Sequence, residues 1–450
     1  MKKNNNKIHQ PLILISSATL LLFFLSFSTL PLGFFNGQRT IDILADIRKT
    51  EPKRVPIIAR AKETTQQVIT HLTQPKDSTF IVDFDFDSIN SLQYFFQKLD
   101  NIKVSHNKVR IAYFGDSFVE GDEMTDELRL RFQTLFGGNG IGFLPMQSTV
   151  AQLYTQININ GSGWKDYNFR DNPAKLPLGI SGHLFYSTGN GMVDYSPKTN
   201  MPPTTVKLYT GKLEKDAVVY INTNGTNQVV GLNINNPINE TVLASNTPIK
   251  SLKITSNNEH IPYYGVSMEG LKGVYLDNYS FRGNTSILNQ QITNEVMTQL
   301  NKYLHYDLII VHYGINAVEH DQTEFEWFEI SMKNLIRNIR KGFGNVPILL
   351  VSTSDMGHKY GNEYLTEKGV PYMVATQREI ARKNNVAFWN LYKAMGGENT
   401  MVNWVEGDTV LACKDYTHLN SVGAKKVGDL FFDKLLASKN YYQRLLNTKK

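Results

Sequence analysis

From Val109 onward, short apolar runs alternate with amphipathic segments, and this alternation limits the possible folds more than any other feature. Strands are predicted at 109–114, 307–312, 346–352 and 386–391, and helices at 125–136, 288–304, 325–341, 364–384 and 421–436. Strands that alternate with helices form a parallel, doubly wound α/β sheet. In such a sheet the functional site lies at the carboxyl ends of the strands.

One long stretch interrupts this pattern. Residues 146–270 contain no helical periodicity, are rich in Asn, Gly, Thr and Tyr, and alternate as strands do. Turn signals such as Asn224-Gly225 separate the strand-like runs. We predict an all-β sandwich inserted between two parts of the α/β domain, at 78–145 and 271–450. Extended irregular loops are the alternative, although loops of this length are uncommon in compact domains.

The N-terminus carries a membrane-targeting pattern. Residues 1–9 contain three lysines, and Pro11–Phe35 contains no charged residue. The apolar run is close to the roughly 20 residues that cross a bilayer. We predict a cytoplasmic N-terminus at 1–9, a signal anchor or signal peptide at 10–36 and a stalk at 37–77. The protein would then be anchored in the inner (cytoplasmic) membrane and face the periplasm, or be secreted or periplasmic if the segment is cleaved; a buried soluble helix is the remaining alternative.

Composition removes several classes of protein. The single cysteine, Cys413, excludes an internal disulfide and any metal site built from clustered cysteines. The net charge of +6 is mild and the basic residues are scattered, so no nucleic-acid partner is expected. The ten histidines contain no H-E-x-x-H pair, and no metal or other cofactor is expected.

Polar residues follow the predicted strands in an informative order. Ser117 lies in Gly115-Asp116-Ser117, where a strand turns into a helix and exposes the hydroxyl. Gly283 precedes the helix at 288–304, and Asn316 follows the strand that ends at His312. Asp415 and His418 lie three residues apart before the last helix. Each residue alone is more often an ordinary turn or helix-entry residue; their order on matching elements makes the pattern specific.

These four blocks resemble the GDSL/SGNH esterase–lipase superfamily. The resemblance implies a flavodoxin-like sheet with Ser117 as nucleophile, His418 as general base and Asp415 as its partner. It also implies an oxyanion hole formed by Ser117, Gly283 and the Asn316 amide. In detail the chain is similar to extracytoplasmic peptidoglycan and polysaccharide O-acetylesterases that carry an inserted carbohydrate-binding-module-like domain. It departs from the superfamily at Ala317, where an acidic residue is frequent.

Two alternatives to the catalytic residues arise from the sequence. Asp355 and His358 form a second Asp-x-x-His pair just after a strand, with the same spacing as Asp415 and His418. The superfamily pair precedes the final helix, and this position favours Asp415 and His418. Cys413 lies two residues before Asp415, and we interpret it as a packed thiol instead of a nucleophile.

Three functions are compatible with the sequence. The first is a serine esterase that removes O-acetyl groups from a cell-envelope or extracellular, peptidoglycan-like glycan through an acyl-enzyme. The second is an O-acetyltransferase that works with a membrane acyltransferase partner. The third is a non-catalytic glycan-binding protein. In each case the insert is expected to contact glycan through exposed aromatic side chains such as Trp164, Tyr167 and Tyr186.

Overall fold

The computed structural model describes residues 79–448, except 87, 89–90, 106 and 287–290. The predicted membrane segment and stalk lie outside these residues. Within the described part of the chain, no helix combines the length and the apolar character needed to cross a membrane.

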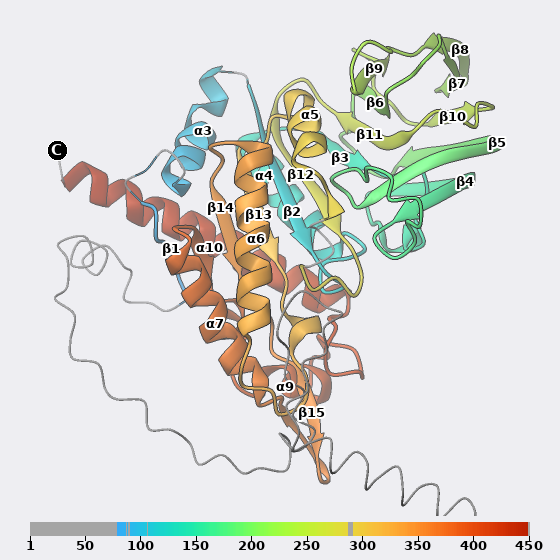
Figure 1. Cartoon of the computed structure of the whole chain (residues 1–450). Coiled ribbons are helices and arrows are strands. Elements are labelled where there is room, and N and C mark those ends of the chain that lie inside the picture. The colour runs from blue at the N-terminus through green and yellow to red at the C-terminus, as the bar shows by residue number, and fades with distance from the viewer. Residues whose placement is uncertain (1–78, 87, 89–90, 106, 287–290, 449–450) are drawn as a thin grey trace, which may run out of the picture. The chain divides into compact units, whose positions relative to one another are not determined.

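The central sheet of the described residues has six strands in the order β1–β17–β14–β13–β2–β12 (Figure 1). Its strands are β1 (Val82–Asp83), β2 (Lys108–Gly115), β12 (Gly273–Ser280), β13 (Leu308–His312), β14 (Ile348–Val351) and β17 (Ala387–Trp389). All neighbours are parallel except β1 and β17. Numbered along the chain, the five parallel strands are ordered 2-1-3-4-5, which is the flavodoxin-like order. The predicted doubly wound sheet is confirmed.

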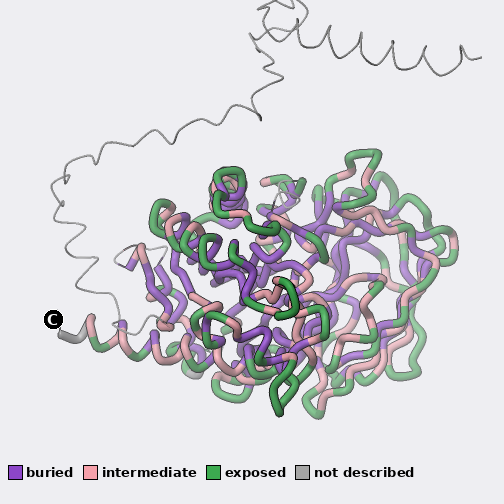
Figure 2. The backbone as a smooth tube through the Cα atoms, turned by 90° about the horizontal axis from the view of Figure 1, so that it is seen from below, coloured by how far each residue is buried: buried purple, intermediate pink, exposed green. Residues whose placement is uncertain are grey.

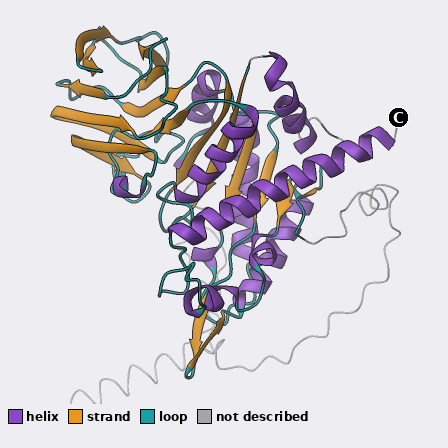
Figure 3. Cartoon of the chain, turned by 180° about the vertical axis from the view of Figure 1, so that it is seen from behind, coloured by secondary structure: helices purple, strands orange, loops and turns teal. Residues whose placement is uncertain are grey.

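Helices cover both faces of this sheet (Figure 3). The longer ones are α3 (Leu92–Ser105), α4 (Glu123–Phe136), α5 (Asn294–Leu304), α6 (Glu326–Phe343), α7 (Gly369–Lys383) and α10 (Ser421–Thr448). Short helices are η1 (Ala151–Leu153), η3 (Ile315–Ala317), α8 (Leu391–Met395) and α9 (Thr400–Glu406). Side chains alternate across each strand, so Ile111 and Tyr113 pack with α3, α4 and α10, whereas Ala112 and Phe114 pack with α5, α6 and α7.

Two helix predictions need correction. The helix predicted at 364–384 starts only at Gly369, because Glu363–Thr366 forms β16 and pairs with β15 (Gly357–Tyr360) in an antiparallel hairpin. Gly361 makes the hairpin turn with a φ of +64°, a conformation that favours glycine. The described part of the helix predicted at 288–304 begins at Asn294, where the Thr293 side chain accepts a hydrogen bond from the N–H of Val296.

The β-rich region forms a second sheet of nine described strands, all paired antiparallel. They are β3 (Gly140–Leu144), β4 (Ile157–Asn168), β5 (His183–Pro197), β6 (Thr205–Gly211), β7 (Val218–Thr223), β8 (Thr226–Gly231), β9 (Ile238–Ala244), β10 (Leu252–Ser256) and β11 (Tyr263–Glu269). β3 pairs with β11, so the sheet starts at residue 140, before the predicted boundary at 146. The sheet branches where β3 joins β11 and β4 joins β5, and its strands share one apolar core, so the predicted β-rich insert is confirmed. Buried residues, purple in Figure 2, run through both sheets.

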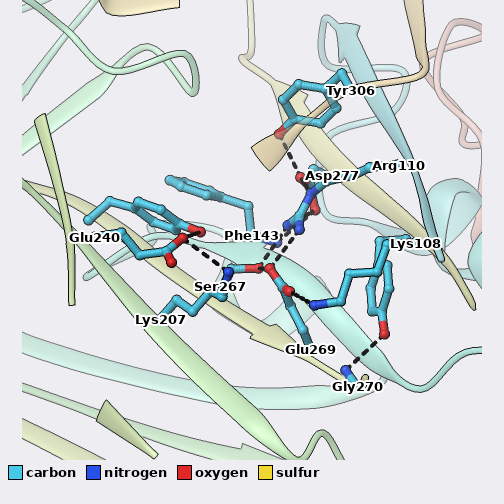
Figure 4. A network of polar contacts seen from close by, with 12 residues as sticks. Lys108, Arg110, Phe143, Lys207, Glu240, Ser267, Glu269, Gly270, Asp277 and Tyr306 are labelled. Atoms are coloured by element: carbon cyan, nitrogen blue, oxygen red, sulfur yellow. Dashed lines mark hydrogen bonds and ion pairs between the residues drawn. The ribbon is translucent and has the colours of Figure 1, made fainter. Parts of the chain in front are cut away.

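A buried polar network joins the two sheets (Figure 4). Arg110 of β2 contacts Asp277 of β12 at 2.6 Å and Glu269 of β11 at 2.6 Å. Ser267 accepts a further hydrogen bond from Arg110, and Asp277 accepts one from the N–H of Phe143. Burial opposes ionisation of Glu269, but Arg110 and Lys108 outweigh it and hold its pKa well below the ordinary value. The insert is therefore fixed to the central sheet by buried ion pairs between Arg110 and two carboxylates.

Candidate active site

Ser117 lies in a tight turn directly after β2. A side chain at Gly115 would place its Cβ 2.2 Å from Cγ2 of Val119, so the turn leaves room only for glycine. The N–H of Phe281, after β12, donates to the carbonyl of Gly115 at 3.0 Å. The turn therefore lies where the order of the sheet reverses, at the carboxyl ends of its strands, as the sequence predicts.

Ser117 meets the loop that precedes α10. Its Oγ is 2.8 Å from Nε2 of His418, and Nδ1 of His418 is 2.7 Å from Oδ2 of Asp415. The other oxygen of Asp415 accepts hydrogen bonds from the N–H groups of Thr417 and His418, at 3.0 Å each. The structure thus places a hydroxyl, an imidazole and a carboxylate in one line of contact.

The Asp415 carboxylate is held in its charged form. Partial burial would raise its pKa, but the hydrogen bonds from the backbone and side chain of His418 outweigh burial and keep the pKa below the ordinary value. A charged Asp415 keeps the proton of His418 on Nδ1 and leaves Nε2 as an acceptor for the Ser117 hydroxyl.

The two other predicted residues adjoin this centre. Gly283 adopts a φ of +72° in the turn after β12, and Asn316 lies in η3 after β13. Nδ2 of Asn316 donates to the carbonyl of Asn284 at 3.4 Å, so the amide lies beside the turn that contains Gly283. β12 and β13 lie on either side of β2, so the two residues flank the turn that contains Ser117. A backbone N–H and a side-chain amide are the type of donors that stabilise an oxyanion.

Asp116, next to Ser117, is a feature that the motif analysis did not assign. Its carboxyl group is buried, and Oδ1 accepts a hydrogen bond from the N–H of Phe118 at 3.0 Å. Burial raises its pKa to about 7 despite this bond and another from the N–H of Gly314. The turn therefore contains a carboxyl group whose proton is held more tightly than in an exposed aspartate. No sequence signal distinguishes this environment, because it depends on neighbouring strands.

The start of α4 is anchored on β12. Arg129 is buried, contacts Asp122 at 2.9 Å and Asp126 at 2.6 Å, and donates to the carbonyl of Leu276. Nδ2 of Asn278 donates to the carbonyl of Val119 at 2.9 Å. These contacts with β12 hold the loop that contains Ser117 in place. A side chain that acts as a nucleophile has to be positioned in this way.

The alternative residues have other partners. Asp355 is buried and accepts hydrogen bonds from Thr366 and from the N–H of Met401, both at 2.8 Å, instead of contacting His358. Burial raises the pKa of the Cys413 thiol, and its Sγ donates to the carbonyl of Leu419. Neither group is arranged as an activated nucleophile or base.

A cavity of about 510 Å³ opens between the insert and the catalytic sheet. It is lined by Glu120 and Gly121, just after the nucleophile, by residues 280–282, just before Gly283, and by polar residues of the insert. Arg170 of the insert donates to the carbonyl of Arg282 at 2.6 Å. A Cβ added to Gly283 would lie 2.7 Å from Nη2 of Arg170. The insert therefore reaches the edge of the catalytic centre.

The expected aromatic contacts are only partly available. Trp164 is 6% exposed, packs edge-on against Tyr263 and donates to the carbonyl of Met192, so it belongs to the core of the insert. The prediction that Trp164 is exposed is wrong. Tyr167 and Tyr186 are partly exposed and contact each other edge-on.

Comparison with known families agrees with the site geometry. Residues 260–426 match the GDSL-like Lipase/Acylhydrolase family. The matched range includes Gly283, Asn316, Asp415 and His418, whereas the insert separates Ser117 from it. The chain therefore carries a GDSL-like domain of the SGNH superfamily and is a carboxylic ester hydrolase. No match to a curated protein was found.

Solved structures extend the fold comparison. A peptidoglycan O-acetylesterase superposes with a TM-score of 0.68 at 21% identity, over 80% of this chain and 99% of that one. This likeness covers the insert as well as the catalytic sheet. An acetyl xylan esterase and a catalytic mutant of an acetylxylan esterase from Geobacillus stearothermophilus match 36% of the chain each, at 18% and 15% identity. Their TM-scores of 0.26 and 0.25 are too low to support an argument.

Proposed function

We propose that the protein is a serine esterase that removes O-acetyl groups from a peptidoglycan-like glycan of the cell envelope. The observation that carries this proposal is the contact line from Ser117 through His418 to Asp415, at 2.8 and 2.7 Å. The likeness to a peptidoglycan O-acetylesterase along 99% of that chain supports the choice of acyl group and glycan.

The proposed reaction follows from these contacts. His418 takes the proton of Ser117 while Oγ attacks the acetyl carbonyl, and Asp415 stabilises the imidazolium that forms. The N–H groups of Ser117 and Gly283 and the amide of Asn316 donate to the oxyanion. His418 then gives its proton to the sugar oxygen that leaves. Water, activated by the same imidazole, releases acetate from the acyl-enzyme.

The cavity suits a carbohydrate better than a lipid chain. Its wall includes charged and amide side chains (Glu120, Asp166, Asn168, Arg170, Asp171, His183 and Arg282). Phe281 and Tyr279 border the cavity on the side of the central sheet, but they are only 8% and 3% exposed and offer little ring surface. Polar groups of this kind can bind sugar hydroxyls, whereas an acyl chain requires an apolar cleft. A glycan that extends from the Ser117 site would follow this cavity.

The predicted location fits this substrate. We propose that the segment at 10–36 directs the rest of the chain across the cytoplasmic membrane. A cell-envelope glycan is accessible on the outer side of that membrane. The segment either remains as an anchor or is cleaved.

The test is acetate release from O-acetylated peptidoglycan by the full-length protein in detergent. The Ser117→Ala variant should lose at least about 10³-fold in rate, as loss of a nucleophile usually causes. Ser162→Ala is the matched control, because Ser162 is exposed on the insert. Acetate release that Ser117→Ala does not lower would refute the role of Ser117. Acetylated sugar as the main product in the presence of a chito-oligosaccharide would instead identify a transferase that works with a membrane acyltransferase.

A further inference from the structure

A second polar cluster lies outside the catalytic residues and includes His358, the histidine of the unused Asp-x-x-His pair. His320 follows η3, His358 lies on β15 and Glu367 follows β16. Nδ1 of His320 is 3.0 Å from Oε2 of Glu367, and Nδ1 of His358 is 3.5 Å from the same oxygen. One potential ligand atom from each residue lies within 4.8 Å of the others. Three separate segments thus direct two imidazoles at one carboxylate oxygen.

Hydrogen bonds from neighbouring groups fix the orientation of the Glu367 carboxylate. The Glu367 side chain is 1% exposed, and its Oε1 accepts hydrogen bonds from the hydroxyl of Tyr360 at 3.1 Å and from the N–H of Asp321 at 3.0 Å. These bonds fix the group and leave Oε2 directed at the histidines. A hydrogen-bonded carboxylate is the usual outer support of a metal ligand.

Two of the three separations between the ligand atoms are close to those of tetrahedral coordination, and all three lie within 4.8 Å. Bonds of about 2.0–2.2 Å from zinc to His nitrogen and carboxylate oxygen place neighbouring ligand atoms about 3.3 Å apart. The two distances to Glu367 lie on either side of this value. The imidazole rings are stacked with centroids 4.1 Å apart and are partly exposed, so small rotations can open them around an entering ion. Asp321 contacts Nε2 of His320 at 3.4 Å through one oxygen and pairs with Lys368 at 2.7 Å through the other.

We propose that His320, His358 and Glu367 bind a divalent transition-metal ion, for which Zn²⁺ is the best match to two imidazoles and one carboxylate. Solvent would occupy the fourth position. The ion takes no part in the Ser117 chemistry. It would connect the segment that follows Asn316 to the β15–β16 hairpin.

The β15–β16 hairpin also contacts the loop that carries Asp415 and His418. The ion would therefore support both this loop and the segment that follows Asn316. The N–H of Gly357 donates to the carbonyl of Tyr416 at 2.8 Å. The ring of Tyr364 stacks on that of Tyr416 with centroids 3.7 Å apart. Tyr416 lies between Asp415 and His418, and Asn316 lies four residues before His320. Fixing this hairpin therefore limits the motion of both loops.

The test uses untagged full-length protein that is stripped with a chelator and then titrated with Zn²⁺. The melting temperature should rise with Zn²⁺, because an ion that binds only the folded state stabilises it. Co²⁺ should give the visible absorption of a tetrahedral site. His358→Ala should weaken Zn²⁺ binding by more than about 10-fold. His320→Ala is a second variant with the same expectation, since its exposed side chain is not needed for folding.

His260→Ala is the matched control, because His260 is exposed on the insert, away from the three ligands in sequence. It should respond to Zn²⁺ as the unmodified protein does. A melting temperature that Zn²⁺ does not raise would overturn the proposal, and so would equal responses in His358→Ala and His260→Ala. Ser117→Ala should bind Zn²⁺ normally, so failure of the metal site and failure of the proposed esterase activity are separate results.

Discussion

Replacement of the buried Asp116 by Asn should change how stability depends on pH. The pKa of Asp116 is about 7 in the folded protein against an ordinary value of 3.8. Between these values the folded state binds the proton more tightly than the unfolded state does, so stability falls as pH rises. From pH 5 to pH 8 this titration removes about 2 to 3 kcal/mol of folding free energy. Asp116→Asn has no such titration and should lack that part of the loss.

The measurement is urea unfolding at pH 5 and pH 8, followed by tryptophan fluorescence. The unmodified protein should lose more stability between the two pH values than Asp116→Asn, by about 2 to 3 kcal/mol. Asn keeps a side-chain oxygen that can accept the hydrogen bond from Phe118. Asp408→Asn, which changes an exposed carboxylate, is the control for the loss of a charge. Equal pH dependence in the unmodified protein and Asp116→Asn would mean that Asp116 stays ionised when buried.

Four further substitutions test other parts of the structure. His418→Ala should abolish hydrolysis of p-nitrophenyl acetate, whereas His358→Ala should leave measurable hydrolysis; the reverse ranking would move the catalytic pair to Asp355 and His358. Asn316→Ala should lower kcat by about 10²–10³ with little change in KM, as loss of one oxyanion donor does. A change in KM alone would make Asn316 a binding residue. Arg110→Met leaves the buried Asp277 without its cation and Glu269 with Lys108 alone, and it should destabilise the fold by about 3–5 kcal/mol in urea unfolding. A loss below about 1 kcal/mol would contradict the proposed role of this network.

The sequence predicts those strands and helices whose buried residues all have apolar surroundings. β2 from Ile111 to Phe114 and β13 from Leu308 to Val311 are uninterrupted apolar runs, because both faces of a central parallel strand are covered by helices. β12 was not predicted, although it is as buried as β2, since Asp277 and Asn278 lie within it. Their cost of burial is offset by Arg110 and by the carbonyl of Val119, which are far away in the sequence. Partners of this kind cannot be recognised from a local pattern.

The same distinction applies to the site. Ser117, Asp415 and His418 could be singled out because each lies at a predictable end of an element, in an order that resembles the GDSL/SGNH superfamily, and the structure brings their side chains into contact. Asp355 and His358 have the same spacing as Asp415 and His418, and only tertiary contacts distinguish the two pairs. Asp355 accepts hydrogen bonds from Thr366 and Met401, whereas His358 contacts Glu367. The spacing along the sequence limits which side chains can contact each other, and the tertiary structure determines which of them do.

The insert is not an independent attachment to the catalytic sheet. A module bounded at 146–270 would lack β3, which pairs along β11, and would separate Glu269 from Arg110. Excision at those boundaries would expose the edge of β11 and leave a buried charge without its partner, so it would damage both sheets. The same attachment holds Arg170 over the turn of Gly283. Binding of a glycan to the insert and attack by Ser117 would therefore share one rigid frame. If the insert binds the glycan as proposed, this frame would fix the orientation of the ester relative to Ser117.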